Sequence, residues 1–254
     1  MKSIALIALN TFRETIRNKI LYNILLFAGI IIVLSTSFGE WSVFARVQVM
    51  QDFGLATMSV SGLLLAVFIG VAMLGKEVTS KTVYMMAAKP VMRGSIIIGK
   101  YAGLCITLCL NFLLMSLFFF GALLFIGSTV NLKLVAAVLL TMVEMGVIVS
   151  VALLFSTITN PTLSAIFTIG FYIAGHFNDL VGIETLEGSK RLLKPVLQVL
   201  YYLLPNLEHF NIRTPVVYDL PLTGDYILFA VLYGLLYITL FMSISCALFA
   251  RKDL

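Results

Sequence analysis

Six runs of apolar residues recur along the chain, and they limit the possible folds more than any other feature of the sequence. The runs cover residues 20–38, 54–75, 101–126, 132–155, 162–175 and 226–250. A helix that crosses the hydrocarbon core of a membrane needs about 20 apolar residues, and all the runs but the fifth are close to this length or exceed it. The sequence therefore predicts an all-α membrane protein with six transmembrane helices.

The composition excludes several other classes of protein. Of the 254 residues, 61% are hydrophobic and 11% are charged, whereas soluble domains average about 45–50% and about 25%. A disordered chain, a nucleic-acid binder and a disulfide scaffold do not fit these values. Cys105, Cys109 and Cys246 all fall inside apolar runs, so we expect reduced cysteines that serve packing.

The fifth run is the shortest and contains Gly170 and Gly175, with His176 directly after it. Short, glycine-interrupted segments are typical of broken helices in transporters. The sequence leaves open whether this run crosses the membrane fully or is re-entrant.

Residues 1–19 are predicted to form an amphipathic helix at the cytoplasmic membrane interface, ahead of a single transmembrane domain over 20–254. One face carries Asn10, Arg13, Glu14 and Arg17, and the other carries Leu9, Phe12 and Ile16. Phe12, Arg13 and Arg17 are the residues expected at the interface, since apolar side chains enter the lipid and basic ones meet its headgroups. A frayed cytoplasmic extension is the alternative.

The basic residues predict the orientation. With the N-terminus inside, the inner segments hold 11 of the 17 Lys and Arg residues, as cytoplasmic loops generally do. Both termini are therefore expected in the cytoplasm, in a bacterial-type inner membrane; the inverse topology would place most short basic segments outside.

Two loops are more than connectors. The outer loop, 178–223, carries a helical apolar pattern between residues 193 and 204, which predicts an extracytoplasmic amphipathic helix. The inner loop, 76–100, holds five basic residues and a Lys89-Pro90 break, which indicates a two-part elbow at the cytoplasmic surface. This elbow would dock a soluble partner or bind only anionic lipid headgroups.

No catalytic or nucleotide-binding set is apparent. The segment 70–77 approaches the phosphate-binding loop pattern, but Glu77 replaces the hydroxyl that would hold Mg²⁺, and an apolar run precedes it instead of a strand. His176 and His209 lack the spacing of metal ligands. We expect no enzyme activity, no metal and no cofactor on this chain, so any ATP it uses must bind to another chain.

Glu144 lies twelve residues into the fourth run, near the expected bilayer midplane. An ionised carboxylate there costs at least a few kcal/mol unless it is paired or hydrated. Two interpretations stay open: a polar point in a translocation path or dimer seam, and a structural residue hydrogen-bonded to Asn111 of the third run.

The inner loop resembles a family signature. Its residues are Glu77, Thr82, Lys89, Pro90, Arg93 and Lys100. Their order resembles the signature of type-2 ATP-binding-cassette (ABC) permeases, although Lys81 stands where the family often has glycine. Segments 10–22 and 201–212 are similar to the branch of that family named for multicopper-enzyme maturation, including nitrous-oxide-reductase assembly.

The resemblance implies a transporter permease that works with two ABC ATPase subunits, which bind ATP and Mg²⁺, and with a second copy or a sister permease. The elbow from Glu77 to Arg93 would transmit ATP-driven closure of the ATPases to the spans. An extracytoplasmic partner is also conceivable, at the outer helix. Other hypotheses are an ATP-independent channel or ion-coupled carrier, with Glu144 as its ion site, and a membrane scaffold.

Overall fold

The computed structural model describes residues 2–40, 46–79, 93–176 and 204–251, and throughout these ranges the regular elements are helices. The long helices are α2 (Lys19–Glu40), α3 (Arg46–Thr79), α5 (Arg93–Phe125), α6 (Leu132–Ile158) and α10 (Gly224–Arg251). The shorter elements are α1 (Lys2–Ile16), α7 (Pro161–His176), the 3₁₀ helix η3 (Leu207–Phe210) and α9 (Arg213–Val217). The prediction of an all-α protein is confirmed.

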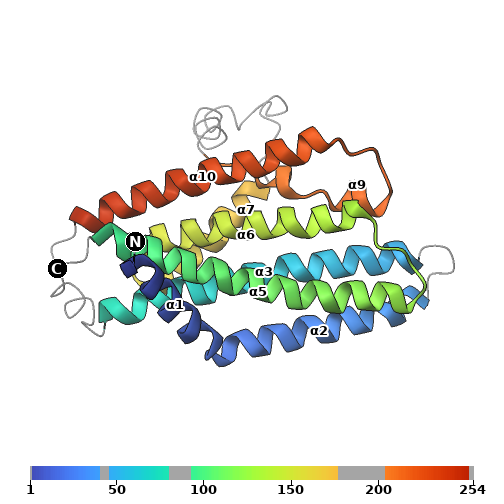
Figure 1. Ribbon diagram of the computed structural model, residues 1–254, viewed down its shortest axis with the longest axis horizontal. Helices are drawn as coiled ribbons and strands as arrows, with labels where there is room; N and C mark the ends of the chain where they lie inside the picture. The colour runs from blue at the N-terminus through green and yellow to red at the C-terminus, as the bar shows by residue number, and fades with distance from the viewer. Residues whose placement is uncertain (1, 41–45, 80–92, 177–203, 252–254) are drawn as a thin grey trace, which may run out of the picture.

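The long helices lie side by side along the longest axis of the molecule (Figure 1). Both chain termini lie at one end of this bundle, which we call the terminal end. The opposite end, where α9 lies, we call the distal end. Because α3 has 34 residues and α5 has 33, each is about 50 Å long and exceeds a hydrocarbon core of about 30 Å.

Four helical segments are long and apolar enough to cross a membrane: Arg46–Val71, Gly94–Phe125, Leu132–Ile158 and Gly224–Arg251. A bent pair, Ser3–Ile16 with Lys19–Leu34, raises the number to five if it forms one broken span. The protein is therefore a multi-pass membrane protein. At 16 residues, α7 is about 24 Å long, less than a full crossing requires. A count of six spans stays a prediction.

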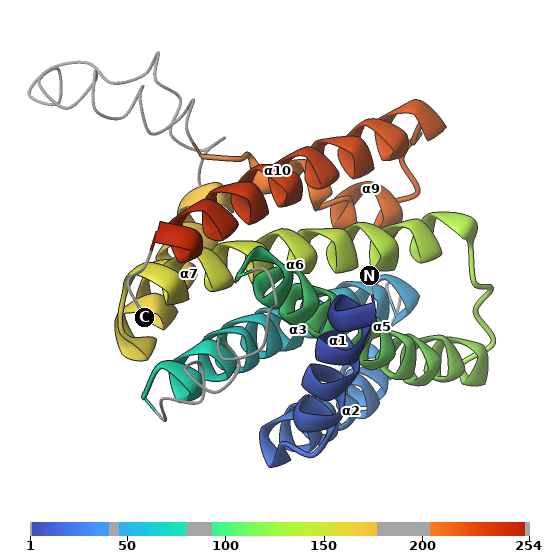
Figure 2. The same ribbon diagram turned by 60° about the vertical axis from the view of Figure 1, so that its left-hand side comes forward.

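The break between α1 and α2 arises at Asn18. Its side chain accepts a hydrogen bond from the backbone N–H of Ile20 at 3.1 Å and so satisfies one of the unpaired donors at the start of α2. The two helices meet at an angle of 61°, and α1 crosses the bundle obliquely in Figure 2.

The centre of the bundle is α6, which packs against α3, α5, α7 and α10. Every residue from Glu144 to Leu153 is buried, as expected for a helix that is apolar on all sides. In contrast, α10 leaves Leu228, Leu232 and Leu236 more than half exposed. Lipid or another subunit can cover such a face.

The outer helix predicted at 193–204 lies outside the described residues except for Leu204. The described remainder of the outer loop forms η3 and α9, two short elements that the sequence pattern did not predict. Leu207 and Phe210 of η3 are 0% and 1% exposed. The described part of the outer loop, residues 204–223, is thus packed into the bundle through η3.

Candidate functional site

A buried acid on the central helix defines the site. Glu144 of α6 is 2% exposed. Its Oε1 atom is buried and makes no hydrogen bond within the described part of the chain. Since a buried carboxylate without a partner is costly, its surroundings decide what it does.

The nearest charged or chargeable neighbour is His176, the last residue of α7. Its Nε2 atom lies 3.4 Å from Oε1 of Glu144, which is within ion-pair distance but longer than a good hydrogen bond. Its Nδ1 atom lies 3.2 Å from the backbone oxygen of Tyr172, and the Tyr172 and His176 rings pack with centroids 4.5 Å apart. The imidazole is therefore held in place by the helix that carries it.

The sequence pattern did not indicate that His176 lies beside Glu144. The chain runs 14 residues from Glu144 to the end of α6 at Ile158 and returns 15 residues along α7 from Pro161 to His176. At 1.5 Å per residue these paths are about 21 and 22 Å long, so an antiparallel pair brings the two side chains to the same depth. Counting residues across this helical hairpin would have predicted the shared depth, but not that the two side chains face each other.

Of the two interpretations left open for Glu144, the structure does not show the hydrogen bond to Asn111. Asn111 of α5 is 1% exposed, but neither its Oδ1 nor its Nδ2 atom has a hydrogen-bond partner among the described residues. The sequence placed both polar residues at middle depth, but it could not tell which faces of α5 and α6 they occupy.

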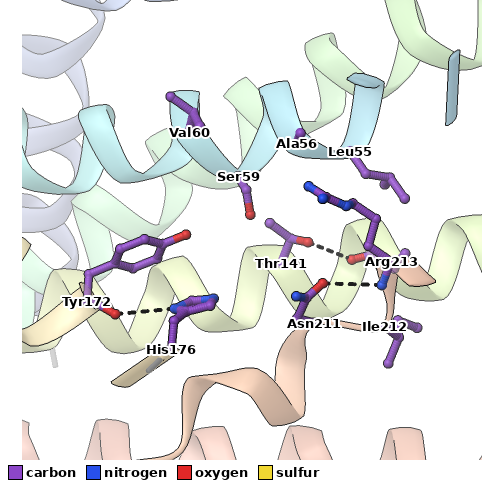
Figure 3. A pocket seen from close by; sticks show the side chains of 11 residues that line it. Leu55, Ala56, Ser59, Val60, Thr141, Tyr172, His176, Asn211, Ile212 and Arg213 are labelled. Carbon is purple, nitrogen blue, oxygen red and sulfur yellow. Dashed lines mark hydrogen bonds between the residues drawn. The ribbon is translucent and has the colours of Figure 1, made fainter. Parts of the chain in front are cut away.

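A cavity of about 190 Å³ opens beside His176, between α3, α6, α7 and the segment before α9 (Figure 3). Its polar lining comes from Ser59, Thr141, Tyr172, His176, Asn211 and Arg213. Apolar residues of α3 and α6, such as Leu55 and Ala137, line the rest. This volume has room for several water molecules or one small solute.

An ion pair lies beside the cavity towards the distal end. Nε of Arg213 is 2.7 Å from Oδ1 of Asp52 on α3, and the two side chains are 40% and 46% exposed. Because Arg213 both lines the cavity and reaches the surface, the cavity extends to the outside of the molecule. The charges of the pair offset each other, which leaves the cavity without a net charge from these two groups.

Hydrogen bonds fix the segment that closes the cavity. Tyr233 of α10 accepts from the backbone N–H of Asn206 at 2.9 Å, and the hydroxyl of Tyr226 donates to the backbone oxygen of His209 at 3.0 Å. Asn206 also caps η3 by accepting from the N–H of Glu208. The outer loop thus forms a fixed wall of the cavity, anchored on α10.

Two of the residues predicted to couple to an ATPase lie at the terminal end. Glu77 belongs to the last turns of α3 and Arg93 begins α5, so both backbones adjoin the elbow. Thr82, Lys89 and Pro90 lie outside the described residues.

Lys100, in contrast, is buried within the bundle at 2% exposure. A buried side chain cannot meet a soluble partner in this state. A role for Lys100 in coupling to the ATPase stays a prediction.

The N-terminal helix packs on α5 through small residues. An added Cβ at Gly103 would lie 2.6 Å from the backbone oxygen of Ala8, and one at Gly99 would lie 2.8 Å from Cβ of Ile7. The packed face of α1 contains Ala8, Thr11 and Thr15, all buried, whereas in the stripe expected in the lipid Leu9 is exposed and Phe12 and Ile16 are half-buried. Arg13 and Arg17 are exposed. The role of α1 as a helix at the membrane interface stays a prediction.

One comparison with known proteins identifies the chain. The model of the ABC-2 family of transporter proteins matches residues 5–254, nearly the whole sequence. No curated protein matches the chain. The ABC-2 permeases are transmembrane subunits that generally work with separate ABC ATPases. The chain belongs to the ABC-2 transporter family and is a multi-pass transmembrane subunit of an ABC transporter.

Proposed function

We propose that this chain is the permease of an ATP-driven transporter and couples ATP hydrolysis on a separate ATPase to export or to transmembrane conformational signalling. The family match over residues 5–254 is the observation that carries the proposal. The length of α3 and α5 supports it, because both helices extend beyond a hydrocarbon core on their way to the elbow.

The terminal end faces the cytoplasm in this proposal. Most of the basic residues of the chain lie in segments that would then be inside. The elbow between Glu77 and Arg93 joins α3 to α5 at this end, so it lies where a cytoplasmic ATPase would dock. ATP and Mg²⁺ bind to that partner and not to this chain.

Movement would pass from the elbow into the bundle through α5. The contact of α1 with α5 at Gly99 and Gly103 is too close for either helix to slide without the other. A push on the elbow would therefore move α5 and α1 together as one rigid element, while α6 stays enclosed by its neighbours. Packed elements of this kind switch between discrete arrangements.

The complete transporter in this proposal holds two permeases, identical or sister chains, and two ATPases. The similarity of segments 10–22 and 201–212 to the multicopper-enzyme maturation branch supports a role in assembling an extracytoplasmic protein. The outer loop packed at the distal end would be the contact surface for that partner.

Charge reversal at the elbow tests the coupling. In a Glu77→Lys/Arg93→Glu double variant, we expect loss of co-purification with the partner ATPase and loss of ATPase stimulation in proteoliposomes. Asp225→Lys is the matched control, because Asp225 lies in the first turn of α10 at the distal end. Unchanged co-purification and stimulation in the double variant would refute the coupling role of the elbow.

The Glu144–His176 pair favours a second candidate function, an ATP-independent ion-coupled carrier. Such a carrier would transport in liposomes that contain the purified chain alone. The ATP-driven permease would need its ATPase and ATP in the same assay, so one experiment separates the two candidates.

A further inference from the structure

The geometry around Glu144 points to a function that permease activity does not require. We propose that Glu144 and His176 form an exchangeable proton-binding site, reached from the distal end through the cavity between α3, α6 and α7. This proposal does not depend on the partner ATPase or on the elbow.

The first step is the state of the imidazole. A backbone carbonyl can only accept a hydrogen bond, and Nδ1 of His176 lies 3.2 Å from the backbone oxygen of Tyr172. Nδ1 therefore carries a proton and donates it to that oxygen. As a result, Nε2, which faces Glu144, is the only ring nitrogen whose protonation can change.

The second step is the count of protons shared by the pair. With one proton between Nε2 and Glu144, the pair is either a neutral imidazole beside a carboxylic acid or an imidazolium beside a carboxylate. Both arrangements have zero net charge. Without that proton, the carboxylate faces a bare nitrogen lone pair, and an uncompensated negative charge is left inside the bundle, at a cost of several kcal/mol. The pair thus binds one proton.

The third step is the route to the pair. Glu144 itself is closed off at 2% exposure, whereas the His176 side chain is 21% exposed and lines the cavity. The cavity is large enough for a chain of water molecules, and Arg213 connects it to the distal surface. In Figure 3 the His176 ring lies at the α7 side of the cavity, with Thr141 and Asn211 between it and Arg213.

The neighbouring charges are few. Glu208 of η3 acts electrostatically on both members of the pair, and Asp52 of α3 is paired with Arg213 of α9. The phenol of Tyr172 adjoins the pair from α7.

The helices α5 and α10 also pack against α6. Lys100 of α5 is buried at 2% exposure, and its neighbour in the chain, Tyr101, donates from its hydroxyl to the backbone oxygen of Gly146 at 3.3 Å. On α10, Gly234 lies beside Val143 of α6. In the described part of the chain, His176 is the titratable group within ion-pair distance of Glu144, so a proton shared by the two balances the carboxylate.

Binding and release of this proton would change the hold on the end of α7. The protonated pair joins α7 to the central helix at middle depth. The deprotonated pair repels, and the outer loop packs directly against the last turns of α7 through Leu207. Proton occupancy would therefore bias the position of α7 and of the outer loop above it.

Infrared spectroscopy of the full chain in lipid nanodiscs tests the site. We expect the wild type to show a carboxyl or carboxylate band that titrates with pH and shifts on transfer to D₂O. Glu144→Gln should remove this titrating band, and His176→Gln should leave a carboxyl band that no longer changes with pH. Glu208→Gln is the control and should keep the transition. Identical titrations in the wild type and Glu144→Gln, or no D₂O shift in the wild type, would overturn the proposal.

Thiol labelling tests the route and uses nearly native protein. In a chain whose three cysteines are replaced by alanine, we expect a membrane-impermeant maleimide added from the distal side to label Ser59→Cys. Ser61→Cys, two residues along the same helix, should stay unlabelled, because Ser61 is 1% exposed. Equal labelling of both positions, or of neither, would contradict access through the cavity.

Discussion

Replacing Gly103 by alanine tests the contact between α1 and α5. The added Cβ would lie 2.6 Å from the backbone oxygen of Ala8 and 2.6 Å from Cβ of Thr11. Side-chain rotation cannot relieve the first contact, because the oxygen belongs to the backbone of α1. The whole of α1 must therefore move away from α5.

The expected magnitude follows from two opposing effects. Alanine is favoured over glycine in a helix by about 1 kcal/mol, and overpacking of a close contact costs about 1–3 kcal/mol. We expect Gly103→Ala to lower the free energy of unfolding by about 0–2 kcal/mol, the difference between these two effects. For a chain of this size each kcal/mol corresponds to about 2–4 °C in Tm, so Tm should fall by up to about 8 °C.

Gly121→Ala is the matched control on the same helix. An added Cβ at Gly121 meets no atom within 4 Å, so only the helix-propensity gain applies and Tm should stay constant or rise by about 1–4 °C. Thermal unfolding of both variants in the same detergent measures the difference. If the two substitutions shift Tm equally, the close approach of α1 to α5 is not what stabilises this end of the bundle.

Three further predictions concern the Asp52–Arg213 ion pair and the packing of the outer loop on α7. The Asp52–Arg213 ion pair should contribute about 0.2–1 kcal/mol to the free energy of unfolding, because both side chains are near half exposed. A double-mutant cycle measured by thermal unfolding gives this coupling energy, and a larger value would contradict the prediction. Leu207→Ala should cost about 2–5 kcal/mol because the side chain is 0% exposed, visible as a lower Tm; no change would mean that the outer loop is not packed as described. Gly175→Ala should also lower Tm, because its Cβ would lie 2.6 Å from Leu207, whereas Gly170→Ala, with nothing within 4 Å, should not; equal effects at the two glycines would refute the packing of the loop on α7.

Helix existence was predictable because it depends on local properties of the sequence. The apolar runs located α3, α5, α6 and α10, since a chain segment in lipid must satisfy its own backbone hydrogen bonds. The short fifth run was also recognisable, as its glycines and its length anticipate the 16 residues of α7. η3 and α9 were missed because elements of four and five residues are too short for a periodic pattern.

The packed faces were predictable only in part. On α1 the pattern predicted only the stripe that meets the lipid, and it did not indicate that Ala8, Thr11 and Thr15 are the residues buried in the bundle. In a membrane bundle close helix packing selects small residues, since lipid covers the large apolar ones equally well. Hydrophobicity therefore does not identify the packed face, as it would in a soluble helix.

The sequence by itself determined the class of protein and the positions of the long apolar helices. Those properties follow from composition, residue counts and charge along one chain. The partner of Glu144 was decided only by the tertiary structure, which turned α7 back along α6 and placed His176, not Asn111, beside the carboxylate. Depth is fixed by the rise of each helix, whereas the facing of two side chains depends on how the helices rotate against all their neighbours at once.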